Sequence, residues 1–112
     1  MAYDEALAQR IRDSLHELPG ITERRMFGGI AFMRDGHMFV GISDDSMMAR
    51  VGPDQYEQML AMKHVRKMDF TGRPMRGYVF IDPAGLKSQK QLLAWLERCA
   101  AFVGTLPAKP RT

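Results

Sequence analysis

The sequence predicts an α+β domain of two layers, in which helices pack against a mostly antiparallel sheet of four to five strands. Apolar residues recur at helical spacing near both ends of the chain. Short apolar stretches separated by turn residues occupy the middle. The length of 112 residues, with 46% of them apolar, suits one hydrophobic core. We therefore expect a single domain over residues 1–107, with the order α-β-β-β-α-β-α, and a flexible tail at 108–112.

The N-terminal segment is predicted to form an amphipathic helix. Leu7, Ile11, Leu15 and Leu18 recur at spacings of three or four residues, which places them on one helical face. The pair Pro19-Gly20 ends the pattern, because proline cannot continue a helix and glycine favours its C-terminal end.

The next segments predict an antiparallel meander of three strands at residues 30–34, 37–43 and 47–51. Asp35-Gly36 separates the first two strands and is a signal for a two-residue type I′ turn. The run Asp44-Asp45-Ser46 is expected to form the next turn.

The second half of the chain predicts a short helix at 54–62, an irregular basic stretch at 64–74 and a fourth strand at 77–81. A long helix is expected at 88–105, with Ser88 as its N-cap. Its apolar stripe consists of Leu92, Leu96, Cys99 and Val103, widened by Trp95, Phe102 and Leu106.

The strands alternate apolar and polar residues poorly, although a sheet with one solvated face should alternate well. One parity holds Ile30, Phe32, Met38, Val40 and Ile42, and the other holds Ala31, Met33 and Phe39. Ten methionines in the chain add to this pattern, because methionine is common at adaptable binding surfaces. Met33 and Phe39 are therefore candidates for an interface with a protein partner or a second copy. Packing of both faces within one domain is the alternative.

Charge and cysteine content suggest a cytoplasmic protein with a mixed surface. The net charge of +3 is spread along the chain, with partial basic clusters at 63–67 and 73–76. A solvated surface explains this distribution, and a nucleic-acid contact is the alternative. The lone Cys99 cannot form an internal disulfide, which suits a reducing compartment. No segment predicts a signal peptide or a membrane-spanning helix, so no membrane contact is expected.

An ordered series of motifs resembles one known family. The run Arg25-Met26-Phe27-Gly28-Gly29 is similar to the signature of TfoX (Sxy) N-terminal domains, and the resemblance extends over residues 20–107. The other matching positions are Gly36, Met38, Phe39, Arg50-Val51, Met68-Asp69-Phe70, Gly72-Arg73-Pro74-Met75, Gly77-Tyr78 and Trp95.

The resemblance implies a regulatory protein of bacterial competence, since full-length TfoX-type regulators promote expression of DNA-uptake genes. Those proteins carry a second, C-terminal domain, so this chain resembles a single-domain form. The family fold is a two-layer arrangement with an antiparallel sheet, which agrees with the order of elements predicted above. The resemblance supplies no catalytic residues.

The candidate binding residues surround the glycine pair. They are Arg25, Met26, Phe27, Gly28, Gly29, Arg50, Arg73 and Arg76. Converging guanidinium groups would bind an anion in bidentate fashion, whereas pairing of each arginine with a carboxylate is the structural alternative. Gly28 and Gly29 lack the spacing of a phosphate-binding loop, so a bulge or a sharp entry into a strand explains them better.

The sequence favours binding over catalysis. The three histidines are far apart, Cys99 lies on an apolar helical face, and no serine sits in a nucleophile motif. We therefore expect no metal, no cofactor and no enzymatic activity. The predicted function is a regulatory module that contacts a protein. The alternatives are an accessory nucleic-acid-binding domain and a small-anion sensor.

Overall fold

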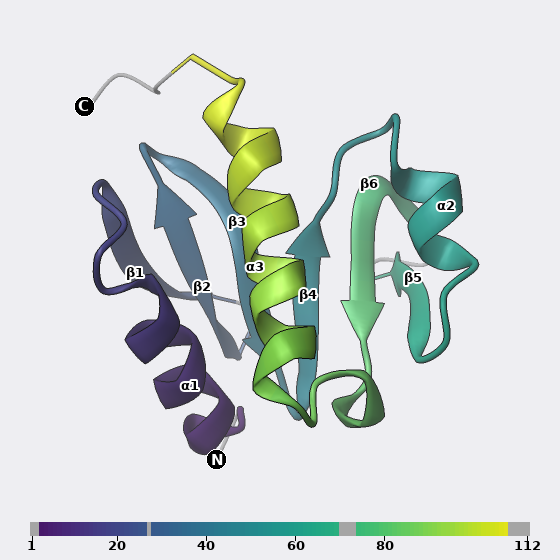
Figure 1. Ribbon diagram of the computed structural model, residues 1–112, viewed down its shortest axis with the longest axis horizontal. Coiled ribbons are helices and arrows are strands. Elements are labelled where there is room, and N and C mark those ends of the chain that lie inside the picture. The colour runs from purple at the N-terminus through teal and green to yellow at the C-terminus, as the bar shows by residue number, and fades with distance from the viewer. Residues whose placement is uncertain (1–2, 27, 70–73, 108–112) are drawn as a thin grey trace.

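The computed structural model describes residues 3–26, 28–69 and 74–107. Within them the chain forms three α-helices, six strands and one 3-10 turn (Figure 1). In chain order these are α1 (Glu5–Leu15), β1 (Ile21–Met26), β2 (Gly29–Arg34), β3 (His37–Ser43), β4 (Ser46–Arg50), α2 (Tyr56–Leu60), β5 (Val65–Asp69), β6 (Pro74–Ile81), η1 (Pro83–Gly85) and α3 (Gln89–Gly104).

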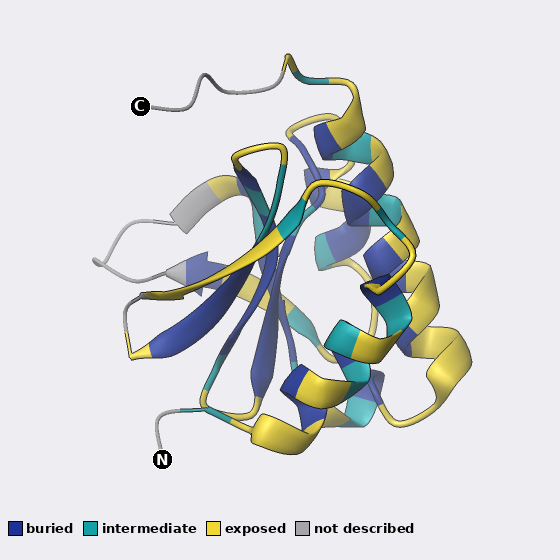
Figure 2. Cartoon of the chain, turned by 90° about the vertical axis from the view of Figure 1, so that its left-hand side faces the viewer, coloured by how far each residue is buried: buried dark blue, intermediate teal, exposed yellow. Residues whose placement is uncertain are grey.

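The six strands form one antiparallel sheet in the order β1-β2-β3-β4-β6-β5. The helices lie on one side of this sheet, with α3 crossing its middle (Figures 1 and 2). The prediction of an α+β fold with two layers is confirmed, although the sheet has six strands instead of four or five.

The two strands that the sequence pattern missed, β1 and β5, are the edges of the sheet. Four consecutive residues of β1, from Thr22 to Arg25, are exposed. In β5, Arg66 and Lys67 are exposed. Charged residues are common on edge strands, where they discourage pairing with another chain. Such strands have too few apolar residues to give an alternating signal.

The Asp35-Gly36 turn and the Ser88 cap are confirmed, whereas α1 ends at Leu15, before Leu18 and the Pro19-Gly20 signal. Asp35 and Gly36 have φ angles of 51° and 86°, as a type I′ turn requires. The Ser88 side chain accepts a hydrogen bond from the Gln91 amide at 3.0 Å, and the Gln91 side chain accepts one from the Ser88 amide at 2.9 Å. This capping box fixes the start of α3.

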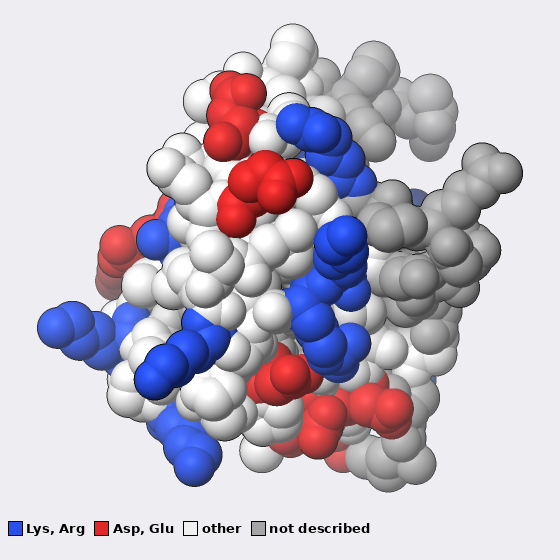
Figure 3. Space-filling view, turned by 90° about the vertical axis from the view of Figure 1, so that its right-hand side faces the viewer, with Lys and Arg blue, Asp and Glu red and all other residues white. Residues whose placement is uncertain are grey.

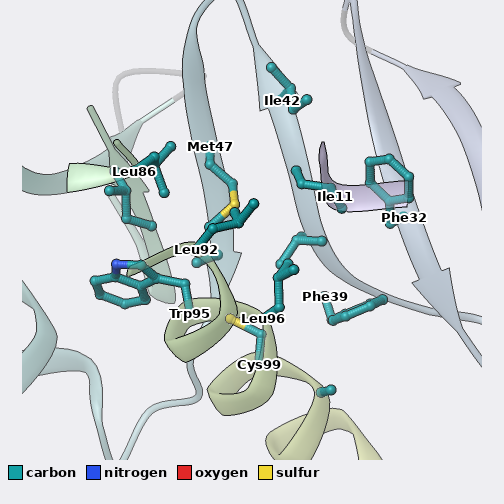
Figure 4. Close-up of a cluster of buried hydrophobic side chains, with 14 of the residues drawn as sticks. Ile11, Phe32, Phe39, Ile42, Met47, Leu86, Leu92, Trp95, Leu96 and Cys99 are labelled. Atoms are coloured by element: carbon teal, nitrogen blue, oxygen red, sulfur yellow. The ribbon is translucent and has the colours of Figure 1, made fainter. Parts of the chain in front are cut away.

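The main core lies between the helices and the sheet. Leu92, Leu96 and Cys99 of α3 point toward the sheet, where they lie among Met47 and other buried side chains (Figure 4). Leu7, Ile11 and Leu15 of α1 belong to the same cluster, as predicted from their spacing. We refer to the side of the sheet that the helices cover as the helix side and to the other as the open face.

A bulge in β3 changes which residues face the core. Phe32 of β2 pairs with Val40, and the next residue, Met33, pairs with Met38, so Phe39 is an extra residue in the register. A bulge shifts the alternation of side chains along a strand. Phe39 therefore turns to the helix side with an exposed fraction of 0%. The expectation that Phe39 lies on the second face is wrong, and Met38 takes that place.

Candidate protein-binding surface

Six residues at paired positions, one from each strand, form a row across the open face. Cross-strand partners share a face of a sheet, and the register places this row opposite the helices. No helix in the described part of the chain covers it (Figure 2). From β1 to β5 the row consists of Arg24, Ala31, Gly41, Met48, Phe80 and Arg66.

The floor of the open face is a second, smaller apolar cluster. Met48, Met68 and Phe80 are buried in it, with exposed fractions of 3%, 1% and 7%. Met38 and Tyr78 pack against the cluster and remain partly exposed. The open face therefore offers half-buried methionine and aromatic side chains above a buried floor, where soluble sheets usually expose polar side chains.

Met33 lies beside this cluster at the β2–β3 pair. It pairs with Thr22 on one side and with Met38 on the other, and it is partly exposed. The predicted interface residue Met33 thus lies on the open face. Met38 and Met48 were missed as candidates, because strict alternation places Met38 with the core and nothing in the sequence signals the bulge.

Arg66 covers one end of the cluster and is already engaged. Its guanidinium carbon lies 4.8 Å from the centroid of the Phe80 ring. Its Nε donates to an Asp82 carboxylate oxygen at 2.8 Å, and an Nη donates to the Ser46 hydroxyl at 2.9 Å. The ion pair and the ring contact hold this cation in place on the sheet.

Arg50 stacks on two rings at the end of β4. Its guanidinium carbon lies 5.5 Å from the Tyr78 ring centroid and 5.6 Å from that of Phe102. The sequence left open that this arginine pairs with a carboxylate. Among the described residues its guanidinium lies over two aromatic rings and forms no ion pair. Arg24, at the β1 end of the row, is exposed.

The predicted cluster of arginines does not assemble among the described residues. Strands β2 and β3 separate Arg25 of β1 from Arg50 of β4. Arg25 pairs with Ile30, whose side chain belongs to the helix-side core, and the guanidinium of Arg50 lies by Tyr78 of β6 and Phe102 of α3. Arg76 is exposed in β6. Arg73 and Phe27 lie outside the described residues, and Met26 ends β1.

The glycine pair has a structural role. Gly28 has a φ angle of 74° in the turn between β1 and β2. A side chain at Gly29 would collide with the carbonyl oxygen of Ile42 on the neighbouring strand. The interpretation of this pair as a sharp entry into a strand fits both positions, since glycine alone tolerates the first conformation without strain and leaves room at the second.

The only cysteine of the chain, Cys99, is buried in the main core. Burial raises the pKa of the Cys99 thiol from 9.0 to about 12. At neutral pH this side chain is therefore a neutral thiol, as expected for a small apolar core residue. Among the described residues, no three histidine, cysteine or acidic side chains gather as potential metal ligands. None of the described helices has the length and apolar character needed to cross a membrane.

The architecture defines a small α+β domain with helices on one side of its sheet and a mixed apolar and basic surface on the other. The family model for the TfoX N-terminal domain matches residues 13–103, and the chain belongs to this family. No curated protein and no solved structure matches the chain.

Proposed function

We propose that this domain is a non-catalytic regulatory module that acts in the cytoplasm by binding another protein through its open face. The observation that carries the proposal is the set of half-buried side chains Met33, Met38 and Tyr78 above the buried floor of Met48 and Phe80. Methionine side chains adapt to the shape of a partner, which suits a surface that contacts another protein.

A different protein suits this face better than a second copy. Arg24 lies at the β1 edge of the open face. Arg50 pairs with Tyr78 in the register, and its guanidinium also reaches the Phe102 ring of α3. In a face-to-face dimer with its two-fold axis near Arg24, this cation would meet its own copy, and juxtaposed like charges oppose association. A partner with carboxylates around an apolar centre would satisfy both the arginines and the methionines.

The family supports the regulatory part of the proposal. TfoX-type regulators act on the expression of DNA-uptake genes, and a domain of this family can contribute through a protein contact without catalysing a reaction. The buried, neutral thiol of Cys99 supports the same view, because a protonated thiol inside a core is a poor nucleophile.

The test is a pair of charge insertions on opposite sides of the domain. Met33→Glu together with Met38→Glu should abolish capture of a protein partner from a cell extract and leave a folded monomer, because carboxylates disrupt the apolar contact. Leu93→Glu is a control for one inserted carboxylate on the other side of the domain, since Leu93 is 36% exposed on α3 in the helix layer. Equal loss of the same partner with both variants would contradict the proposal.

Light scattering at low and high salt completes the test. We expect a monomer under both conditions. A dimer that resists salt and is lost in the methionine variant would replace the partner protein with a second copy.

The second candidate function is contact with a nucleic acid. It is favoured by the exposed basic side chains Arg24, Arg25, Arg76, Lys63 and Lys67. Against it, Arg50 and Arg66 already occupy the rings of Tyr78 and Phe80, which a stacking base would need. This function predicts binding that weakens steeply with salt, because neutralised phosphates release counterions.

A further inference from the structure

A groove runs along the first turns of α3 on the helix side, away from the open face. One wall is the connection between α2 and β5, with Met62, Lys63 and His64. The other wall is α3 itself, with Lys90, Trp95 and Arg98. We call it the α3 groove.

The α3 groove is basic. Lys63, Lys90 and Arg98 line it, and no acidic side chain is among its lining residues in the described chain. None of these three cations takes part in an ion pair between described residues. Figure 3 shows Lys and Arg side chains spread over the side of the molecule that holds α2 and β5, with Asp and Glu side chains among them. Cations that lack acidic partners within the fold are free to meet an acidic ligand.

The groove also has apolar surface, and two of its cations lie far apart along α3. Met62 is 42% exposed at its rim, one of the two large apolar side chains that stand out among the described residues. Lys90 and Arg98 are eight residues apart on α3, which corresponds to about 12 Å along a helix. An occupant that contacts both cations needs negative charges separated by a similar distance, and the exposed Met62 offers it an apolar contact.

The wall formed by residues 62–64 is held in place before any ligand binds. His64 has a φ angle of 68°, a conformation that non-glycine residues rarely adopt. Its carbonyl oxygen accepts a hydrogen bond from the Asp82 amide at 2.8 Å. Gly85 leaves room for the His64 side chain, since a Cβ at position 85 would lie 3.1 Å from the His64 Cβ. A preformed wall reduces the entropy lost on binding.

The surroundings of Trp95 favour a peptide over a nucleic acid as the occupant of the groove. Arg98 lies over the Trp95 ring, with its guanidinium carbon 5.0 Å from the centroid, and Trp95 is only 4% exposed. A base would therefore find no free ring on which to stack. An acidic peptide needs no such ring, because its carboxylates bind the cations and an apolar side chain can rest on Met62.

We propose that the α3 groove binds an acidic peptide segment of a partner protein. The carboxylates of the segment contact Lys63, Lys90 and Arg98, and an apolar side chain between them packs against Met62 and the edge of Trp95. This site is separate from the open face, and it stands whether or not the open face binds a protein.

The experiment uses Trp95 as a reporter, because it is the only tryptophan of the chain. The probe is a short synthetic peptide of glutamates with one central leucine, added to the whole protein at low salt. We expect a saturable change in Trp95 fluorescence that weakens as salt is added. The same peptide with glutamine in place of glutamate should give no change.

Charge-reversal variants test whether the peptide binds in the α3 groove. Lys63→Glu combined with Lys90→Glu should weaken the peptide about tenfold, since each reversal replaces a weak attraction with a repulsion of similar size. Lys67→Glu combined with Lys87→Glu changes the net charge equally at positions that do not line the groove and should weaken binding much less. All four residues are exposed, so both variants should fold like the wild-type protein.

Three outcomes would overturn the proposal. The first is an absent response to the peptide, and the second is equal weakening by the two double variants. The third is tighter binding of a single-stranded oligothymidine, or of inorganic phosphate, than of the peptide. Tighter oligothymidine binding would make the groove a nucleic-acid site, and tighter phosphate binding would make it a small-anion site. None of these results bears on the capture experiment with Met33 and Met38.

Discussion

The two sides of the sheet are built from similar side chains and yet differ in what covers them. On the helix side, α1, α2 and α3 close a continuous core that includes residues from β2, β3, β4 and β6. On the open face, three buried residues are screened by Met38, Tyr78 and the stacked Arg66. Apolar content alone therefore does not define a core. The helix side holds most of the buried apolar residues, and the open face leaves Met38 and Tyr78 partly exposed.

Two adjacent residues of β3 give the sharpest test of this difference. Phe39→Ala should lower the free energy of unfolding by about 3–5 kcal/mol, because it leaves a cavity in the main core. Met38→Ala should cost about 1 kcal/mol, because Met38 is partly exposed on the open face. Urea denaturation of both variants measures the two values. Equal losses would mean that the bulge does not separate the two residues.

The titration of the Cys99 thiol tests whether water reaches the core on the helix side. Burial raises its pKa from 9.0 to about 12, so the unfolded chain releases this proton at lower pH than the folded one. The stability that Cys99 contributes is complete below pH 9 and falls by up to about 1.4 kcal/mol for each pH unit between 9 and 12. Unfolding curves across this range measure the slope.

Cys99→Ala serves as the control for the thiol, since it removes this titration and keeps the other ionisable groups. The difference in stability between the two proteins should therefore change as the pH rises. A constant difference would show that water reaches the thiol in the folded state.

The helix layer depends on the start of α3. Ser88→Ala removes the hydroxyl that accepts from the Gln91 amide and should cost about 1 kcal/mol. Thermal unfolding would detect this loss. Ser88→Asp should retain most of the stability, because aspartate also caps a helix, and a loss as large as that of alanine would argue against the cap.

The smallest losses of stability are expected for two ion pairs, one on each side of the sheet. Arg12 and Glu23 join α1 to β1 at 2.6 Å, and hydrogen bonding to Arg12 lowers the pKa of Glu23. Arg12→Ala should cost less than about 1 kcal/mol, because the pair is partly exposed. Its contribution is present at neutral pH and is lost as acid protonates Glu23.

Arg66→Ala, on the open face, should cost more than Arg12→Ala. It removes the ion pair with Asp82, the hydrogen bond to Ser46 and the cover over Phe80 together. Comparing the two variants at low and high salt separates the electrostatic part from the packing. If Arg12→Ala were the more damaging variant, the open face would not depend on its stacked arginine.

The sequence predicts this fold where side chains repeat and fails where the sheet is irregular or polar. The stripes of α1 and α3, the Asp35-Gly36 turn and the Ser88 cap follow from local physics, and the structure confirms them. Strands β1 and β5 were missed because edge strands need few apolar residues. The site was harder to predict, since strand order, which no local pattern gives, keeps Arg25 and Arg50 apart.

The charged edges of the sheet also bear on how the protein behaves when it is crowded. Both open edges, β1 and β5, could in principle accept a strand from a neighbouring molecule and extend into a fibril. Such growth would bring Arg24 and Arg25, or Arg66 and Lys67, against like charges of the next copy. The domain can therefore keep an apolar face available without its backbone edges becoming sites of amyloid-like aggregation.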